Sequence, residues 1–199
     1  MARCEVCFRH CEIKEGQLGF CGARTCRNKQ ICAANYGRIT SLALDPIEKK
    51  PLRRFHPGGK ILSVGSYGCN LRCPFCQNDE ISWSEQALRY AEFGKWDETA
   101  NRKVCAEELE MLTPEELAAA AKFYQRQGNI GIAFTYNEPL IGFEFVRDTA
   151  KLVKEQGMVN VLVTNGTAEL SVLEKLAPYI DAMNIDLKGF TDRYYNDVL

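Results

Sequence analysis

Short apolar runs alternate with stretches of helical periodicity over residues 60–199. Each run has the length and composition of a buried strand, and the runs cover residues 61–66, 130–135, 159–164 and 183–187. Helices are predicted at residues 114–127, behind the capping box Thr113-Pro114-Glu115-Glu116, at 143–156 and at 170–179. A fourth helix is expected to begin at Thr191-Asp192. Strands and helices that alternate at this spacing predict βαβ units with a parallel sheet, and hence the α/β class.

The N-terminal part of the chain follows neither period. Residues 1–35 are rich in cysteine and are predicted to form a small metal-organised module, and residues 35–44 a strand or hairpin arm that ends at Asp45-Pro46. Residues 49–59, with two prolines and the pair Gly58-Gly59, indicate a linker and turn. We therefore expect a cysteine-rich metal-binding module with its linker at 1–59 and an α/β domain at 60–199. Residues 79–112 are acidic and are expected to be a helical insertion.

Composition places the chain among ordinary globular proteins, with 46% hydrophobic and 26% charged residues. No apolar run approaches the roughly 20 residues of a membrane span and no signal-peptide core is present, so a cytoplasmic location without membrane association is expected. In that compartment the 10 cysteines are expected to be metal ligands rather than disulfides. Lys and Arg are in excess over residues 1–60, but they are dispersed and lack an aromatic platform, which disfavours nucleic acid as a partner.

Three cysteines directly after the first apolar run form the most specific motif, Cys69-x3-Cys73-x2-Cys76. Cysteine thiolates are the usual ligands of iron–sulfur clusters. Three of them can hold three irons of a [4Fe-4S] cluster, which leaves the fourth iron open to a small molecule. An open coordination site is typical of a reactive metal centre. The alternative is a zinc site that a distant fourth residue completes.

Polar side chains follow the later apolar runs. Glu138 comes after the second run, and its carboxylate suits a cationic amine. Thr164 and Asn165 end the third run, and their hydroxyl and amide groups suit a ribose or a carboxylate. Asp186 and Lys188 follow the fourth run two positions apart, so both side chains point to the same side. Because active sites of parallel sheets lie at the carboxyl ends of the strands, these residues are expected to gather there. Taken alone, each motif is also typical of a turn, a loop carboxylate or a structural ion pair.

The N-terminal module contains a second set of cysteines, Cys4-x2-Cys7-x3-Cys11-x9-Cys21. Four thiolates are enough to close a tetrahedral site, so a structural Zn²⁺ is the favoured occupant. A second iron–sulfur cluster uses the same ligands and is the alternative. His10, Cys26 and Cys32 are close enough in the sequence to replace a member of the set.

The spacing of Cys69, Cys73 and Cys76, with the aromatic Phe75 before the last, resembles the cluster motif of the radical S-adenosylmethionine (SAM) enzymes. The resemblance implies a partial (β/α) barrel, with about four parallel strands in this chain. It also implies a [4Fe-4S] cluster that binds SAM at its open iron and cleaves it to methionine and a 5′-deoxyadenosyl radical. By the same resemblance Phe75 packs near the adenine, Lys188 is the catalytic residue facing the substrate or the SAM carboxylate, and SAM is positioned by Glu138, Thr164, Asn165 and Asp186.

Several segments taken in order resemble a narrower group, the radical SAM member of the AmmeMemoRadiSam system, which is similar to pyruvate formate-lyase-activating enzymes. The segments are Gly16-x2-Gly19-Phe20-Cys21-Gly22, Tyr36-Gly37-Arg38, Asp45-Pro46-Ile47-Glu48-Lys49-Lys50-Pro51-Leu52, the cysteine motif through Asn78, Tyr136-Asn137-Glu138-Pro139 and Asn184-Ile185-Asp186-Leu187-Lys188-Gly189-Phe190. The resemblance implies a one-electron donor of the flavodoxin or ferredoxin kind. It identifies no substrate.

The leading hypothesis is therefore a radical SAM enzyme that abstracts hydrogen from an unidentified substrate. One alternative is an activase that makes a glycyl radical in another enzyme, and another is a non-catalytic iron–sulfur or zinc-binding interaction protein. Radical SAM barrels have more βα units than this chain shows before Leu199. We expect a chain that is truncated at its C-terminus or completed by a partner. Its open apolar sheet edge should then be covered by a partner, a second copy or the N-terminal module.

Overall fold

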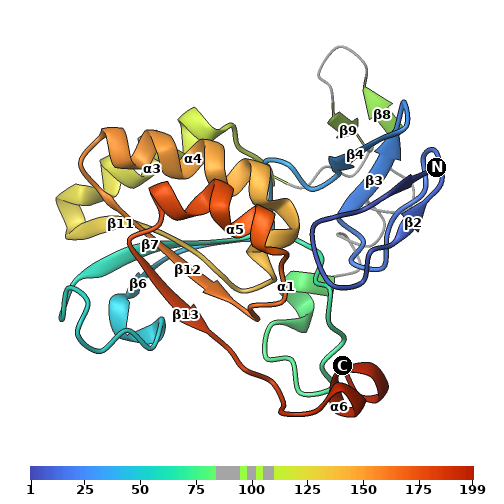
Figure 1. Ribbon diagram of the computed structural model, residues 1–199. Helices are drawn as coiled ribbons and strands as arrows, with labels where there is room; N and C mark the ends of the chain where they lie inside the picture. Colours follow the sequence, from blue (N-terminus) through green and yellow to red (C-terminus); the bar gives the residue numbers. More distant parts are fainter. Residues whose placement is uncertain (84–94, 98–101, 105–109) are drawn as a thin grey trace.

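A five-stranded sheet forms the centre of the computed structural model, which describes residues 1–83, 95–97, 102–104 and 110–199 (Figure 1). Its strands are β6 (Ser41–Pro46), β7 (Lys60–Gly65), β11 (Asn129–Phe134), β12 (Val159–Thr164) and β13 (Ala182–Ile185), in the order β13-β12-β11-β7-β6. Strands β7, β11, β12 and β13 run parallel, and β6 pairs antiparallel with β7 at one edge. The sheet is open and does not close into a barrel, which confirms the expected α/β class with a partial barrel.

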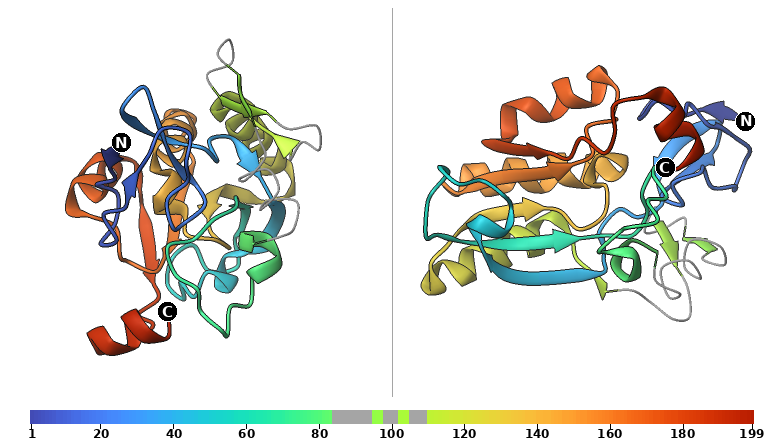
Figure 2. Two further views of the ribbon diagram at one scale, coloured as in Figure 1. Left: turned by 90° about the vertical axis from the view of Figure 1, so that its right-hand side faces the viewer. Right: turned by 90° about the horizontal axis from the view of Figure 1, so that it is seen from below.

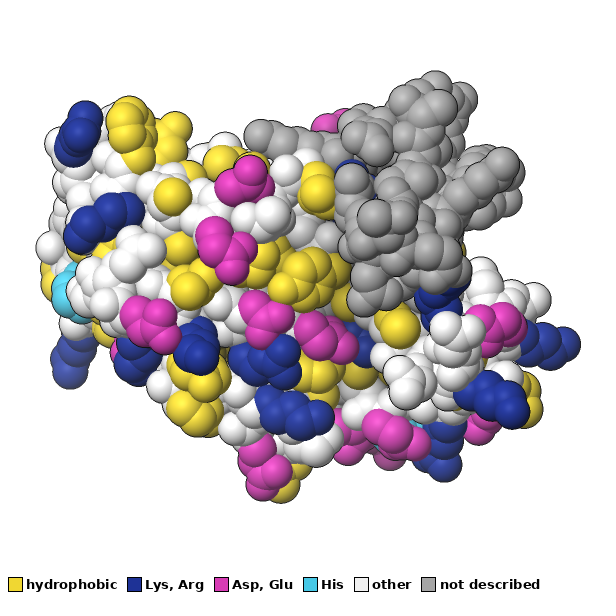
Figure 3. All heavy atoms as spheres, turned by 90° about the horizontal axis from the view of Figure 1, so that it is seen from above, with side chains coloured by type: hydrophobic (Ala, Val, Ile, Leu, Met, Phe, Trp, Pro, Cys, Tyr) yellow, Lys and Arg dark blue, Asp and Glu magenta, His cyan; other side chains and the backbone are white. Residues whose placement is uncertain are grey.

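Three helices cover one face of the sheet (Figures 1 and 2). The helices are α3 (Pro114–Tyr124), α4 (Phe143–Glu155) and α5 (Leu170–Leu176). Short 3₁₀ turns adjoin them: η2 (Gln125–Gln127) extends α3, η3 (Pro139–Gly142) precedes α4, and η4 (Ala177–Tyr179) continues α5. The predicted capping box is present, because Thr113 Oγ1 accepts from the Glu116 N–H and the Glu116 carboxylate accepts from the Thr113 N–H. Leu62, Ile132 and Leu162 belong to the core shared with these helices. On the face of the molecule that Figure 3 shows, charges of both signs are interspersed among hydrophobic side chains.

Residues 47–59, including η1 (Ile47–Lys49), pack against the sheet through a small apolar cluster. Ile47 is fully buried there beside Ile61 and Val161, and Leu52 packs against the same group. The expected break at Asp45-Pro46 is wrong, since β6 runs through Pro46. A proline is tolerated there because it lies at the end of an edge strand, where a missing N–H costs little. The sheet therefore includes a strand from the N-terminal side of the boundary expected at residue 59.

The N-terminal module consists of two short antiparallel pairs, β1 (Ala2–Arg3) with β2 (Glu12–Ile13) and β3 (Arg24–Arg27) with β4 (Gln30–Ala33). Backbone hydrogen bonds from the Glu169 N–H to the Val6 carbonyl and from the Phe8 N–H to the Thr167 carbonyl attach it to the loop after β12. Figure 2 shows the module at the end of the sheet where the C-terminus also lies. The module thus stands beside the carboxyl ends of the parallel strands.

Among the described residues of the acidic insertion, helix is found at its start, in α1 (Asp79–Trp83). The described residues that follow form strands: β8 (Lys95–Asp97) pairs antiparallel with β9 (Arg102–Val104), and β10 (Glu110–Met111) with β5 (Arg38–Ile39). The expectation of a helical insertion is therefore wrong for these residues. Cys105, to which the sequence assigned no role, lies outside the described residues.

The β13 edge is open within the described part of the chain, where no strand pairs with its outer side. The short helix α6 (Asp192–Asp197) follows it and begins as predicted, with Thr191 Oγ1 accepting from the Tyr194 N–H. What covers this edge stays a prediction. Among the described helices, none has both the length and the apolar character that crossing a membrane requires.

Candidate functional site

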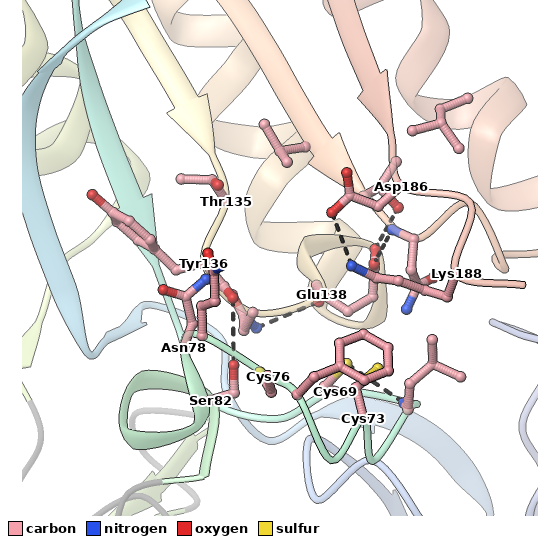
Figure 4. Close-up of a pocket in the computed structure, with 18 of the residues that line it drawn as sticks. Cys69, Cys73, Cys76, Asn78, Ser82, Thr135, Tyr136, Glu138, Asp186 and Lys188 are labelled. Carbon is pink, nitrogen blue, oxygen red and sulfur yellow. Dashed lines mark hydrogen bonds and ion pairs between the residues drawn. The ribbon is translucent and has the colours of Figure 1, made fainter. Parts of the chain in front are cut away.

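The carboxyl ends of β11, β12 and β13 and the loop after β7 enclose a cavity of about 530 Å³ (Figure 4). Such a volume is typical of small-molecule sites. The site residues expected at the strand ends and in the cysteine motif all line it: Cys69, Cys73, Phe75, Cys76, Glu138, Thr164, Asn165, Asp186 and Lys188. Sequence reasoning did not assign roles to several polar lining residues, namely Gln77, Asn78, Ser82, Thr135, Tyr136 and Asn137.

The cysteine motif occupies the loop between β7 and α1, and its three thiols are partly buried. The Leu71 N–H donates to Cys69 Sγ at 3.5 Å, and the Cys76 N–H donates to the Cys73 carbonyl at 3.1 Å, so the loop folds back on itself. Burial raises the pKa of the Cys69 thiol to about 12, and the nearby Glu138 carboxylate adds to the rise. The Cys69 thiol is therefore protonated in the free protein, and a metal that binds it must displace the proton.

The donor set of this loop fits an iron–sulfur cluster better than a single ion. Among the described residues, no three His, Cys, Asp or Glu side chains are arranged to hold one metal ion. Each of the three thiolates of a four-iron cluster binds a different iron, so such a cluster does not require the sulfur atoms to meet at one point. Soft thiolate donors are the ligands that iron–sulfur clusters prefer.

The N-terminal cysteines Cys4, Cys7, Cys11 and Cys21 line a second, much smaller cavity of about 10 Å³. Burial raises the pKa of Cys4, and it raises that of Cys21 to about 11. A zinc ion would need the sulfur atoms to converge on one tetrahedral centre. Because the described residues contain no such arrangement, the expected zinc is not supported.

Tyr136 and Asn137 line the cavity and attach the end of β11 to segments that lie behind the cavity wall or next to it. Tyr136 Oη donates to Asp45 Oδ2 at 2.8 Å. Asn137 Nδ2 donates at 3.0 Å to the carbonyl of Gly68, directly before the cysteine motif. The backbone of Tyr136 has a φ of 73°, a conformation that residues other than glycine rarely adopt. Strain of this kind is concentrated at functional sites, where the surrounding contacts impose it.

Glu138 is almost fully buried, and most of its acceptor capacity is used within the protein. Oε1 accepts from Thr164 Oγ1 at 2.7 Å and from the Leu140 N–H at 3.0 Å, and Oε2 accepts from the Asn165 N–H at 2.8 Å. Burial raises the pKa of Glu138 to about 7, although these three donors oppose the rise. Asn165 Nδ2 in turn donates to Asn70 Oδ1 at 2.8 Å. The residues expected to contact SAM from β11 and β12 thus form one buried network.

Asp186 and Lys188 lie beyond the end of β13 and point toward each other, as their spacing predicts (Figure 4). Lys188 Nζ is 3.0 Å from Asp186 Oδ2. Burial alone would lower the pKa of Lys188, but the Asp186 carboxylate raises it, and Cys73 and Cys76 contribute in the same direction. The cavity therefore has a positive charge beside two of its three thiols.

A buried network behind the cavity wall was missed by sequence reasoning. Asp45 Oδ2 accepts from Lys50 Nζ at 3.0 Å, Ser63 Oγ at 2.9 Å and Tyr136 Oη at 2.8 Å, and Oδ1 accepts from Lys49 Nζ at 2.9 Å. Burial alone would raise the pKa of Asp45, but these donors hold it well below its usual range. The signal in the sequence is the charged pattern of residues 45–52, but Asp45-Pro46 there predicts a strand break and residues 49–59 predict a linker, so neither pattern indicates a buried network.

Comparison with known proteins gives matches over most of the chain. The family model described as the radical SAM superfamily matches residues 63–199. An uncharacterized protein of Methanocaldococcus jannaschii is 43% identical over 193 residues, which cover 96% of this chain and 51% of that protein. The pyruvate formate-lyase-activating enzyme of Clostridium pasteurianum is 28% identical over 128 residues, 64% of this chain and 45% of the enzyme. The pyruvate formate-lyase 1-activating enzyme of Escherichia coli K12 is 25% identical over 134 residues, 66% of this chain and 47% of the enzyme. The chain spans about half the length of these relatives.

Proposed function

The chain belongs to the radical SAM superfamily, and we propose that it cleaves SAM reductively and abstracts hydrogen from a substrate, with a [4Fe-4S] cluster held by Cys69, Cys73 and Cys76. The observation that carries this proposal is the single cavity that the three thiols share with polar side chains from the ends of three parallel strands. When bound, the cluster supplies the electron that splits SAM into methionine and a 5′-deoxyadenosyl radical.

The side chains of the cavity wall suit the polar groups of SAM. Glu138 Oε2 accepts one hydrogen bond from the protein, so it keeps a lone pair for the amino group, since each carboxylate oxygen can accept two. Lys188 offers a positive charge for the carboxylate, and Asp186 orients it. Phe75 is exposed at the mouth and can pack on the adenine. Thr164 and Asn165 hold Glu138 in place and act as positioning residues.

Two finer assignments belong to the same proposal. Reductive cleavage consumes one electron, and we assign its supply to a flavodoxin- or ferredoxin-like protein. We also assign the chain to the radical SAM member of the AmmeMemoRadiSam system. The support for this narrower group is segment 45–52, which carries the resemblance and supplies Asp45 and Lys50 to the network behind the cavity.

A glycyl-radical-enzyme activase is the second candidate, and the open side of the cavity favours it. Ile185 and Leu187 line the cavity and are 59% and 64% exposed, and Phe190 nearby in the sequence is 92% exposed. An apolar, open mouth of this kind can admit a loop of a protein substrate. Two of the relatives are also named as pyruvate formate-lyase-activating enzymes.

Anaerobic reconstitution with iron and sulfide, followed by dithionite and SAM, tests the proposal. We expect the wild type to take up iron and to release 5′-deoxyadenosine. Cys73→Ala should lose the iron of this site and the product, whereas Cys32→Ala, which removes a partly buried thiol outside the cavity, should lose neither. A wild type that binds a cluster but forms no 5′-deoxyadenosine would show the proposal to be wrong and would favour a non-catalytic interaction protein. A glycyl-radical signal in an added glycyl radical enzyme would identify the activase.

A further inference from the structure

Two arginines stack on one partly exposed phenylalanine where the N-terminal module meets the cysteine loop. The guanidinium carbon of Arg9 lies 3.6 Å from the centroid of the Phe20 ring, and that of Arg72 lies 4.5 Å from it. The guanidinium carbon of Arg72 also lies 3.3 Å from the centroid of the Trp83 ring, and that of Arg9 lies 5.1 Å from the centroid of the Phe8 ring. Phe8 and Phe20 are 38% and 41% exposed. We call Phe8, Arg9, Phe20 and Arg72 the arginine–phenylalanine surface.

Carboxylates do not neutralise this surface within the described part of the chain, where neither Arg9 nor Arg72 forms an ion pair. The nearby Glu5 is paired with Arg3 and His10 instead. Both guanidinium groups donate to backbone carbonyl oxygens, so among the described residues their positive charge has no carboxylate partner. An uncompensated pair of guanidinium groups on an aromatic ring is suited to binding acidic groups of a partner.

The surface is also connected directly to the cysteine motif. Arg9 Nε donates to the Asn70 carbonyl at 2.6 Å, and Arg72 Nη1 donates to the Cys69 carbonyl at 3.0 Å. Arg72 Nη2 donates to the Phe20 carbonyl at 2.8 Å, which joins the module to the loop. A partner seated here would therefore lie against the loop that carries Cys69, Cys73 and Cys76.

We propose that the arginine–phenylalanine surface is the docking site of an acidic one-electron carrier protein, an inference that rests on the proposed function. The electron must come from outside the chain: the carrier is oxidised by one electron, the cluster is reduced by one, and no bond forms or breaks. Carboxylates around the carrier's redox group would compensate both arginines. Arginine and aromatic residues are enriched at protein interfaces, and electron-transfer interfaces are small enough for such a surface to suffice.

Charge reversal at Arg9 tests the docking site in the full, reconstituted chain. Bleaching of the cluster absorbance is followed in stopped flow with a photoreduced acidic flavodoxin and, separately, with dithionite. At low ionic strength Arg9→Glu should slow reduction by flavodoxin about tenfold, and added salt should shrink the difference, because electrostatic steering is screened. Dithionite reduction and dithionite-driven 5′-deoxyadenosine formation should not change.

Arg126→Glu is a matched control, because Arg126 lies over the exposed Phe123, 5.3 Å from its centroid, beyond the end of α3. It should behave as the wild type with both reductants. Phe8→Ser, at an exposed side chain, should slow only the flavodoxin reaction and guards against a folding defect in Arg9→Glu.

The outcomes separate this proposal from the proposed function. The docking site would be overturned if flavodoxin reduced the wild type and Arg9→Glu at equal rates, or if the wild type took electrons only from dithionite. It would also be overturned if Arg9→Glu slowed the reduction by flavodoxin and by dithionite to the same extent. Loss of single-stranded RNA binding in Arg9→Glu with unchanged flavodoxin reduction would assign the surface to nucleic acid and likewise overturn it. If the wild type forms no 5′-deoxyadenosine even with dithionite, the proposed function itself fails.

Discussion

Lys50 Nζ lies 3.0 Å from Asp45 Oδ2, and the two side chains are only 4% and 9% exposed. The same carboxylate oxygen accepts from Tyr136 Oη, whose residue lines the cavity. A buried charge is tolerated when an opposite charge and hydrogen bonds compensate it. The pair therefore connects the segment that packs on the sheet to the wall of the candidate site.

Asp45→Asn should destabilise the protein strongly, because it leaves the Lys50 ammonium buried without its counter-charge. Breaking a buried ion pair on one side costs about 3–5 kcal/mol, and we expect a loss of this size in the free energy of unfolding, measured in urea. Lys49→Met is the control: Lys49 Nζ also contacts Asp45, but its side chain is 65% exposed, so its loss should cost less than about 1 kcal/mol. Equal costs for the two variants would contradict the structure.

Glu138 predicts a dependence of stability on pH. Its pKa rises from 4.5 to about 7 in the folded protein, so over this window the folded state keeps a proton that the unfolded chain releases. The free energy of unfolding should then fall as pH rises from 4.5 to 7. Glu138→Gln does not titrate, so the wild type should lose about 1–3 kcal/mol relative to this variant over the window. Urea unfolding of the metal-free proteins measures the unfolding free energy of the wild type minus that of Glu138→Gln at each pH. If this difference stayed constant or grew as the pH rises, the prediction would be contradicted.

Gly68 allows the segment before the cysteine motif to approach the N-terminal module. It has a φ of 88°, and a Cβ at this position would lie 2.6 Å from the Cys21 carbonyl oxygen and 2.8 Å from Ala23 Cβ. Gly68→Ala should therefore cost about 2–4 kcal/mol in unfolding free energy and lower iron uptake during reconstitution. Gly58→Ala separates the backbone strain of a positive φ from the steric clash of the added Cβ, because Gly58 has a φ of 77° but open space around its Cβ position. It should cost only about 1 kcal/mol, from the backbone alone.

The parallel strands β7, β11 and β12 could be predicted closely because they are largely buried on both faces, so their sequences are continuous apolar runs. The predicted strand at 159–164 coincides with β12, and the others differ from the structure by only a few residues at their ends. The polar residues at the carboxyl ends of β11, β12 and β13 then meet in one cavity, because parallel strands end at the same edge.

Other features depend on tertiary contacts that no local pattern contains. Asp45-Pro46 is typical of a strand break, yet both residues are the last two of the edge strand β6 and pair with β7. The Asp45 carboxylate accepts hydrogen bonds from Ser63 on β7 and from Tyr136 after the end of β11. Glu138 follows its strand as expected, but its partners Thr164 and Asn165 come from the neighbouring strand. The strands of the N-terminal module are too short to establish a period, and cysteine spacing alone does not make the sulfur atoms converge.

Lys188 predicts a change in thiol reactivity that needs no cofactor. Burial raises the pKa of Cys73, and the Lys188 ammonium opposes the rise. Lys188→Met should raise the pKa of Cys73 further, so that less thiolate is present at pH 8 and alkylation by iodoacetamide, followed on the Cys73 peptide by mass spectrometry, slows about two- to fivefold. Lys154→Met is the control, because Lys154 pairs with Asp181 at 3.1 Å outside the cavity and its loss should leave the rate unchanged. A Cys73 rate that is equal in all three proteins would show that the Lys188 charge does not act on the cysteine loop, and its proposed position facing the SAM carboxylate would lose its support.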